Sequence, residues 1–156
     1  SNYLNDSLIT IALNDLKIIG ILNTVYNPKQ YLSPSFRSIL TSDMKRDLPK
    51  YISKYANKDI QVLNVTDIIE FNNKDTLINA PYGQYLFNQI KKDKVSDFEL
   101  NQMKINTKSL ATNYLNKIMI NYDFDIFISV DNSMAGIAAA AHFPALTIPM
   151  GYRNDG

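Results

Sequence analysis

A stretch near the C-terminal end, residues 123–152, constrains the fold of this chain more than any other. It opens with Ile126 to Val130, a short apolar run rich in β-branched side chains. Such a run is typical of a strand that is covered on both faces. Polar side chains follow at the C-terminal end of this predicted strand, where open α/β sheets place their ligands: Asp131, Asn132 and Ser133.

The next part of this stretch consists almost entirely of small residues. Met134 to Phe143 includes Gly136 and four consecutive alanines, which predicts a helix able to pack very closely against its neighbours. Pro144 ends that helix, and the extended apolar run Ala145 to Ile148 predicts a second strand. Strand, polar loop, small-residue helix and strand together predict a βαβ-like unit.

The rest of the chain reads as a helical cover for this unit. Helices are predicted at five further places: from Leu8 to Ile19, with Gly20 as its C-cap; from Ser35 to Tyr55; from Asp67 to Asn73, with Thr66 as its N-cap; from Tyr82-Gly83-Gln84 to Lys92; and from Asp97 to Tyr122. In the second of these, Pro49 predicts a kink or a break near Asp47. In the last, Ser96 and Glu99 stand at the spacing of a capping box. A strand is also predicted from Ile21 to Tyr26.

These elements predict an α/β fold that is rich in helix, with a mixed sheet covered by helices. The predicted strands are too few for a complete sheet. The last residues, 151–156, form a turn signal with no strand after it. We therefore expect residues 1–156 to be one partial domain of a longer protein.

Composition excludes several classes of protein. The chain is 46% hydrophobic and 20% charged, with a formal net charge of +1, so neither disorder nor a nucleic-acid or membrane surface is indicated. Without cysteine, disulfides and thiol catalysis are excluded. This does not fix the compartment, because many secreted bacterial proteins also lack cysteine; of the compartments, we favour the cytoplasm. No apolar run reaches the length of about 18 residues that a membrane span needs.

The residues offer no catalytic constellation. The five glycines, at positions 20, 83, 136, 151 and 156, cannot form a phosphate-binding loop or a dinucleotide fingerprint. The only histidine, His142, is expected to be a packed or helix-terminal residue rather than a metal ligand. No serine or lysine lies in a recognisable activating sequence. We therefore predict no catalytic residue, no metal and no cofactor in this chain.

The best candidates for ligand contact are Asp131, Asn132 and Ser133, because they follow a predicted buried strand and precede a helix. They could equally be the N-cap of that helix, and both roles are compatible. Tyr82 and Gln84 are further candidates, since Gly83 between them allows a close approach of the backbone, although a simple helix-starting turn explains them too.

Residues 123–152 resemble the C-terminal part of the amidase-signature hydrolases. The matching motifs are the strand entry Asp123-Phe124-Asp125-Ile126, the Ala/Gly-rich segment Met134 to Ala141, and the run Pro144-Ala145-Leu146-Thr147-Ile148-Pro149-Met150-Gly151-Tyr152. Upstream, Thr66 to Asn72 and Tyr82-Gly83-Gln84 also resemble helices of this family, as does the helix and strand pair that begins at Leu8.

The resemblance covers nearly the whole chain and is nearest to the bacterial amidase and peptide-amidase branch. Around residues 131–133 the chain departs from the Pro-Thr-x-Pro of the glutamyl-tRNA amidotransferase subunits, which argues against that branch. The resemblance implies a serine–cis-serine–lysine hydrolase of carboxylic amides. The family's three catalytic residues lie N-terminal to the matched part, so none is assigned here.

The resemblance implies that this chain supplies part of the fold and one wall of an acyl pocket. The substrate of that pocket would be a small-molecule or peptide amide. Asn132, Ser133 and Met134 are expected to face the substrate, with Phe71, Tyr82 and Gln84 as weaker candidates. An alternative is a non-catalytic α/β module that binds a ligand at residues 131–133. Unpaired strand edges further predict that the chain can self-associate.

Overall fold

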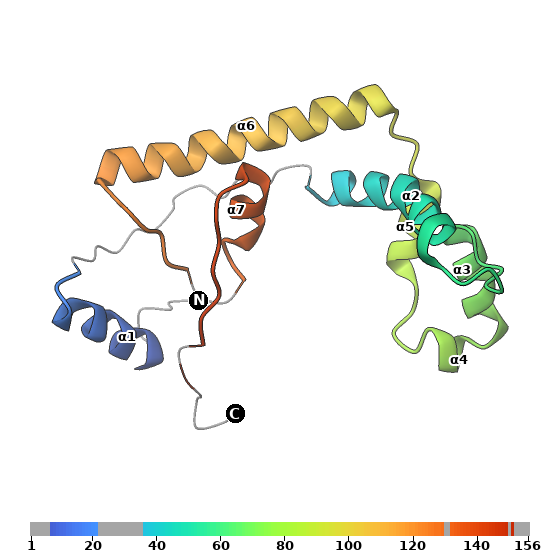
Figure 1. Cartoon of the computed structure of the whole chain (residues 1–156), viewed down its shortest axis with the longest axis horizontal. Helices are drawn as coiled ribbons and strands as arrows, with labels where there is room; N and C mark the ends of the chain where they lie inside the picture. The colour runs from blue at the N-terminus through green and yellow to red at the C-terminus, as the bar shows by residue number, and fades with distance from the viewer. Residues whose placement is uncertain (1–6, 22–35, 130–131, 150, 152–156) are drawn as a thin grey trace. The chain divides into compact units, whose positions relative to one another are not determined.

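A computed structural model describes residues 7–21, 36–129, 132–149 and 151 of the 156-residue chain. This part of the chain contains seven α-helices (Figure 1). They are α1 (Ser7–Ile18), α2 (Phe36–Tyr55), α3 (Val65–Lys74), α4 (Thr76–Asn79), α5 (Tyr85–Lys92), α6 (Asp97–Tyr122) and α7 (Ala135–Ala141).

The predicted α/β fold with a mixed sheet is wrong, because the described residues contain no β-strand. Ile126 to Ser129 and Ala145 to Pro149 run on without regular secondary structure, although both were predicted to be strands. Of the third predicted strand, only Ile21 lies within the described residues. The apolar pattern indicates a tendency toward burial, but a strand also needs a neighbouring chain to complete its hydrogen-bond ladder. No such neighbour pairs with these segments in the described part of the molecule.

The chain divides into two compact units, residues 33–110 and residues 1–32 with 111–156. In the unit of residues 33–110, α3 packs against α4 and α5, and α2 packs against α3 and α5. Its apolar core is formed by Val65, Ile69 and Ile90, against which Leu48 and Phe87 pack. The helices of this unit are therefore joined by a small core contributed mainly by α3 and α5.

Helix α2 continues through Pro49, so the predicted break near Asp47 is absent. Proline removes one backbone donor and crowds the preceding turn, which costs about 3 kcal/mol in a helix interior. Tertiary contacts of the turn just before Pro49 oppose this cost, with Leu48 packed on the apolar core and Arg46 bound to Val95 and Asp97.

The contact of α2 with the segment after α5 is a polar cluster, which we call the Arg46 clamp: Ser42, Lys45, Arg46, Asp93, Val95 and Asp97. Arg46 donates from Nε to Asp97 Oδ1 at 2.7 Å and from Nη2 to the Val95 carbonyl at 2.6 Å. The buried Ser42 hydroxyl donates to Asp93 Oδ2 at 3.0 Å, and the Lys45 ammonium donates to the Asp93 carbonyl. One face of α2 thus binds both backbone carbonyls and carboxylates of residues 93–97, where the chain passes from α5 into α6.

Helix α3 begins at Val65 and its N-cap is Asn64, so the prediction that Thr66 is the cap was wrong by two residues. The Asn64 side chain accepts hydrogen bonds from the amides of Thr66 and Asp67 at 2.7 and 3.3 Å. The Asp67 carboxylate accepts in return from the Asn64 amide at 3.1 Å. This reciprocal pair satisfies donors that the first turn of a helix leaves open.

Replacing Asn64 by Ala is expected to lower the free energy of unfolding by about 1 kcal/mol, because two helix amides lose their acceptor. Urea denaturation followed by circular dichroism measures the change. Asn101→Ala is the matched control, since Asn101 is exposed within α6 and alanine is a better helix former there. Equal stability of the two variants would contradict the capping role.

The predicted capping box at the start of α6 is confirmed. The Glu99 carboxylate accepts from the Ser96 hydroxyl at 2.7 Å and from the Ser96 amide at 2.8 Å, and the Glu99 amide donates to Ser96 Oγ at 3.2 Å. Hydrogen bonds from the Ser96 hydroxyl and then from its amide hold the pKa of Glu99 below its ordinary value, since they favour the ionised form.

In the other unit, the predicted C-cap of α1 is confirmed. Gly20 has a φ of +86°, and the amides of Gly20 and Ile21 donate back to the carbonyls of Lys17 and Leu16. This pattern is a Schellman motif, which favours glycine because of the left-handed backbone. Residues buried in this unit are Ile9, Ala111, Leu115, Ile118, Ile137, Ala140 and Ala141.

Candidate functional site

The turn before α7 contains three of the predicted substrate contacts, Asn132, Ser133 and Met134. The side chains of Asn132 and Ser133 are exposed and Met134 is half-buried. Met134 occupies the N-cap position of α7, and its carbonyl accepts from the amides of Ile137 and Ala138, both at 3.1 Å. Asn132 and Ser133 therefore precede the cap, and the prediction that they form it is wrong. Asp131 lies outside the described residues.

Helix α7 itself is shorter than the predicted range of Met134 to Phe143. It ends at Ala141, and its C-cap residue, His142, adopts a left-handed backbone with a φ of 59°. The His142 and Phe143 amides donate to carbonyls of the last turn, at Ala139 and Ala138, 3.2 and 3.0 Å away. His142 is thus a helix-terminal residue, as the sequence predicts.

Tyr82 lies on a tight turn between α4 and α5. The Gly83 amide donates to the Ala80 carbonyl at 2.8 Å, and Gly83 has a φ of +76°, a backbone region that glycine enters without strain. The Tyr82 side chain is 100% exposed. Within its own unit, this aromatic ring is therefore presented to the surroundings and not packed into the core.

Gln84 links the start of α5 to the end of α3. Its Oε1 accepts from Asn72 Nδ2 at 3.2 Å, and its Nε2 donates to Asn73 Oδ1 at 2.7 Å. Asn72 is buried, with 8% of its surface exposed, so it needs such a polar partner. Both ends of the Gln84 amide are used to hold the turn that carries Tyr82, and sequence reasoning missed this structural role.

Phe71, the remaining candidate, is about half exposed on α3. The Lys74 ammonium lies 5.9 Å from the centre of its ring, and the Asn79 side chain donates to its carbonyl at 3.2 Å. Phe71, Tyr82 and Gln84 belong to the unit of residues 33–110, whereas residues 132–134 belong to the other unit. The candidates thus form two groups, one in each unit.

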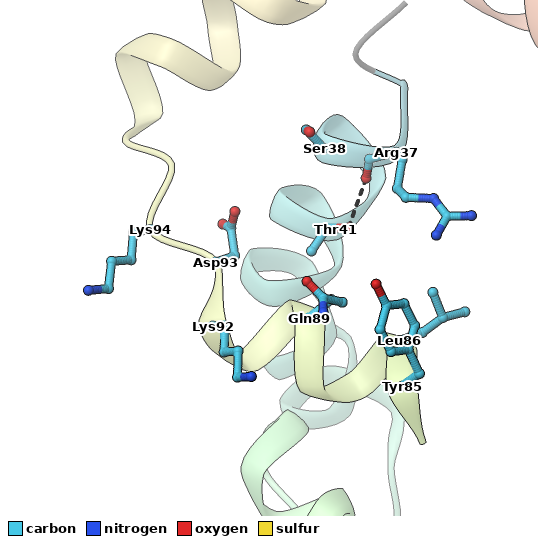
Figure 2. A pocket seen from close by; sticks show the side chains of 9 residues that line it. All are labelled: Arg37, Ser38, Thr41, Tyr85, Leu86, Gln89, Lys92, Asp93 and Lys94. Carbon is cyan, nitrogen blue, oxygen red and sulfur yellow. Dashed lines mark hydrogen bonds between the residues drawn. The ribbon is translucent and has the colours of Figure 1, made fainter. Parts of the chain in front are cut away.

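A pocket that the sequence did not predict lies between α2 and α5 and has a volume of about 320 Å³ (Figure 2). Its lining residues are Arg37, Ser38, Thr41, Tyr85, Leu86, Gln89, Lys92, Asp93 and Lys94. The Thr41 hydroxyl is occupied by the Arg37 carbonyl at 2.8 Å, and the Asp93 carboxylate by Ser42 of the Arg46 clamp. Arg37 and Lys94 extend away from each other in Figure 2, so these cationic groups do not converge on one ligand atom.

The described part of the chain offers no cluster of three or more histidine, cysteine or acidic side chains that could hold a metal ion. Nor is any helix within those residues long and apolar enough to cross a membrane. Among the described candidates, Asn132, Ser133, Tyr82 and Gln84 carry hydrogen-bonding side chains, and Met134 and Phe71 carry apolar ones.

Comparisons with known proteins place this geometry in a larger context. A crystal structure of an amidase family protein from Bacillus anthracis str. Ames is similar to this chain with a TM-score of 0.85 and 25% sequence identity. The match covers 96% of this chain and 29% of that protein. No protein-family model matches the sequence, and neither does any curated protein.

This similarity supports an amidase-related chain. The backbone of almost the whole chain superposes on one part of the amidase family protein, whose chain is much longer than the matched part. The expected resemblance to amidases is therefore supported at the level of structure. The predicted branch of the family and the predicted contacts to substrate stay predictions.

Proposed function

We propose that this chain is part of an amidase that hydrolyses the C–N bond of carboxylic amides. The observation that carries the proposal is the structural similarity to the Bacillus anthracis amidase family protein over 96% of the chain. A second support comes from the sequence, where the motifs between Asp123 and Tyr152 resemble the amidase-signature hydrolases.

In this proposal the chain contributes scaffold and one wall of the substrate pocket, while the nucleophile and its base belong to the rest of the amidase. There a serine, a bridging cis-serine and a lysine would form an acyl-enzyme, with backbone amides stabilising the oxyanion. The substrate is a small-molecule or peptide amide.

The turn before α7 suits a pocket wall. The Asn132 side chain carries a carbonyl and an amide group, so it can donate to a substrate carbonyl and accept from a substrate N–H. Met134 offers a flexible thioether that adapts to apolar groups of different shape. Tyr82 is a second predicted contact, and Gln84 acts through it by holding its turn on Asn72 and Asn73.

A chimera tests this proposal directly. The matched 29% of the Bacillus anthracis protein is replaced by residues of this chain, and hydrolysis of a panel of acyl amides is measured beside the unmodified protein. The chimera is expected to hydrolyse amides that the unmodified protein hydrolyses, whereas this chain alone is expected to show no turnover. A soluble, folded chimera that cleaves none of them would contradict the proposal.

Asn132→Ala in the same chimera is expected to raise KM by about 2- to 12-fold and to change kcat less than twofold. This range corresponds to the loss of one hydrogen bond of about 0.5–1.5 kcal/mol that is equally strong in the bound substrate and the transition state. Steady-state kinetics on the acyl amide panel measure it. Asn101→Ala, which changes an exposed residue of α6, is the control and should leave KM unchanged. Identical kinetics of the two variants would remove Asn132 from the pocket.

A further inference from the structure

The pocket between α2 and α5 has no role in the proposed function, since none of its lining residues is among the predicted substrate contacts. All of the lining belongs to the unit of residues 33–110. The volume of about 320 Å³ is near the lower end of the range for small-molecule sites, which begins at about 300 Å³. The size of the pocket therefore suits a small molecule.

The two walls of this pocket are helical and are held together by contacts outside it. On α5, Ile90 is part of the apolar core and Phe87 packs against it. The residues that follow α5 are bound to α2, because the Ser42 hydroxyl donates to the Asp93 carboxylate and the Lys45 ammonium to the Asp93 carbonyl. A pocket with walls fixed in this way is formed before a ligand arrives, which lowers the entropy cost of binding.

The charged groups of the lining favour an anion. Arg37, Lys92 and Lys94 are cationic, and all three side chains are exposed. The acidic residue in this lining, Asp93, is already compensated within the Arg46 clamp, where its carboxylate lies 3.8 Å from Arg46 Nη1. The ion pairs among the described residues include none of the three lining cations. Their positive charge is therefore available to a ligand.

The lining between the cations is neutral. In the view of Figure 2, Gln89 lies between Arg37 and Lys94, and its side-chain amide can both donate and accept a hydrogen bond. Tyr85 and Leu86 add apolar surface and are 65% and 59% exposed. A ligand that spans the pocket thus meets a cation at each end and a mixed polar and apolar surface between them.

We propose that this pocket binds an elongated small-molecule dicarboxylate. Because Arg37 and Lys94 extend away from each other, one carboxylate cannot contact both, whereas two carboxylates joined by a short chain can (Figure 2). The planar guanidinium of Arg37 matches one carboxylate, and the Lys94 ammonium binds the other as a point charge. The methylene groups between the two carboxylates contact Leu86 and Tyr85. The inference does not rest on the proposed amidase activity.

An NMR titration of the whole ¹⁵N-labelled chain tests this site at constant ionic strength. Succinate, adipate and suberate are the probes, and each is compared with the monocarboxylate and the diamide of the same chain length (for adipate, hexanoate and adipamide). We expect at least one dicarboxylate to bind with a Kd of about 1 mM or lower. It should bind about tenfold or more tightly than its monocarboxylate and its diamide, and should shift the amides of residues 37–41 and 85–94.

Variants assign the two ends of the ligand. Arg37→Gln and Lys94→Gln are each expected to weaken the best dicarboxylate by about tenfold, because each removes one charge-assisted contact. Lys58→Gln is the matched control. It removes the same charge from an exposed residue of the same unit that does not line the pocket, so the Kd should not change. Circular dichroism should be the same for all three variants.

Several results would overturn the proposal. Equal weakening by Lys58→Gln would show a general attraction of anions to the surface. Equal affinity for a dicarboxylate and its monocarboxylate, or sensitivity to Arg37→Gln or Lys94→Gln alone, would show that one acidic group suffices. Shifts confined to residues outside the pocket, or no binding at all, would remove the site.

The chimera provides a second measurement by thermal denaturation. A saturating concentration of the best dicarboxylate should raise the Tm of the folded chimera but not that of its Lys94→Gln form, since ligand binding stabilises the native state. A folded chimera without this rise would overturn the site. Neither measurement requires amide turnover, so loss of the dicarboxylate site would leave the amidase role intact, and an inactive chimera that binds dicarboxylate would do the reverse.

Discussion

Arg46→Ala is expected to lower the free energy of unfolding by about 2 kcal/mol. The substitution removes the bonds from Arg46 to the Asp97 carboxylate and to the Val95 carbonyl, at 2.7 and 2.6 Å. It also takes the cationic partner from Asp93, whose side chain is only 9% exposed and lies 3.8 Å from Arg46 Nη1. A carboxylate that loses its partner in such a setting is costly, because little water can replace it. The Arg46 side chain is 26% exposed, which keeps the expected loss below that of a fully buried ion pair.

Two further variants sharpen this experiment, with urea denaturation of the whole chain as the measurement. Arg46→Lys keeps the charge but cannot reproduce the forked geometry, so we expect it to recover only part of the lost stability. Lys50→Ala is the matched control on the same helix. Its ion pair with Asp47 joins side chains that are 75% and 66% exposed, and such pairs contribute about 0–1 kcal/mol. An Arg46→Ala variant as stable as Lys50→Ala would show that the Arg46 clamp does not stabilise the unit.

Six of the seven helices in the described residues, all except α4, were predictable because their signals are local. The hydrogen bonds of Ser96 with Glu99, and the left-handed backbone at Gly20, depend only on residues within one or two turns. The two-residue error at the start of α3 has the same origin. Asn64 and Thr66 are both good capping residues, and the sequence alone does not say which of them adopts the non-helical backbone.

The errors in the fold come from interactions between distant residues. Pro49 remains inside α2 because two residues of the turn before it make distant contacts. Arg46 binds the Val95 carbonyl, more than forty positions away, and Leu48 packs on an apolar core built by other helices. The runs at Ile126 and Ala145 were predicted to be strands from apolar, β-branched residues. Pairing is a property of two chain segments, and no segment pairs with either run in the described residues.

The candidate site was only partly visible in the sequence. Gln84 was singled out because it follows Gly83, but its amide proves to be bound to Asn72 and Asn73. The pocket between α2 and α5 joins residues near position 40 with residues near position 90. No motif marks it, although Gln89 and Lys92 on α5, and Ser38 and Thr41 on α2, repeat at the helical spacing of three. That repeat was the one signal that could have indicated a shared polar face.

Ile69→Ala is expected to have the largest effect on stability, with a loss of about 2–4 kcal/mol. Ile69 is 6% exposed and forms the apolar core of its unit with Val65 and Ile90. Truncation removes three carbon atoms from this core and leaves a cavity. The core has only three buried residues, so few neighbouring apolar side chains can move into the cavity. In such a small core, a single truncation is therefore expected to lower the free energy of unfolding strongly.

Ile69→Val and Ile105→Ala complete the experiment, with thermal and urea denaturation of the whole chain as the measurements. Ile69→Val removes one carbon atom, and its expected loss of about 0.5–1.5 kcal/mol tests whether the effect scales with the volume removed. Ile105 is 61% exposed on α6, where alanine is the better helix former, so Ile105→Ala should be neutral or slightly stabilising. If Ile69→Ala and Ile105→Ala were equally stable, the Val65–Ile69–Ile90 cluster would not be the core that joins these helices. A graded loss from Val to Ala would establish that burial of Ile69 is what stabilises the contact between α3 and α5.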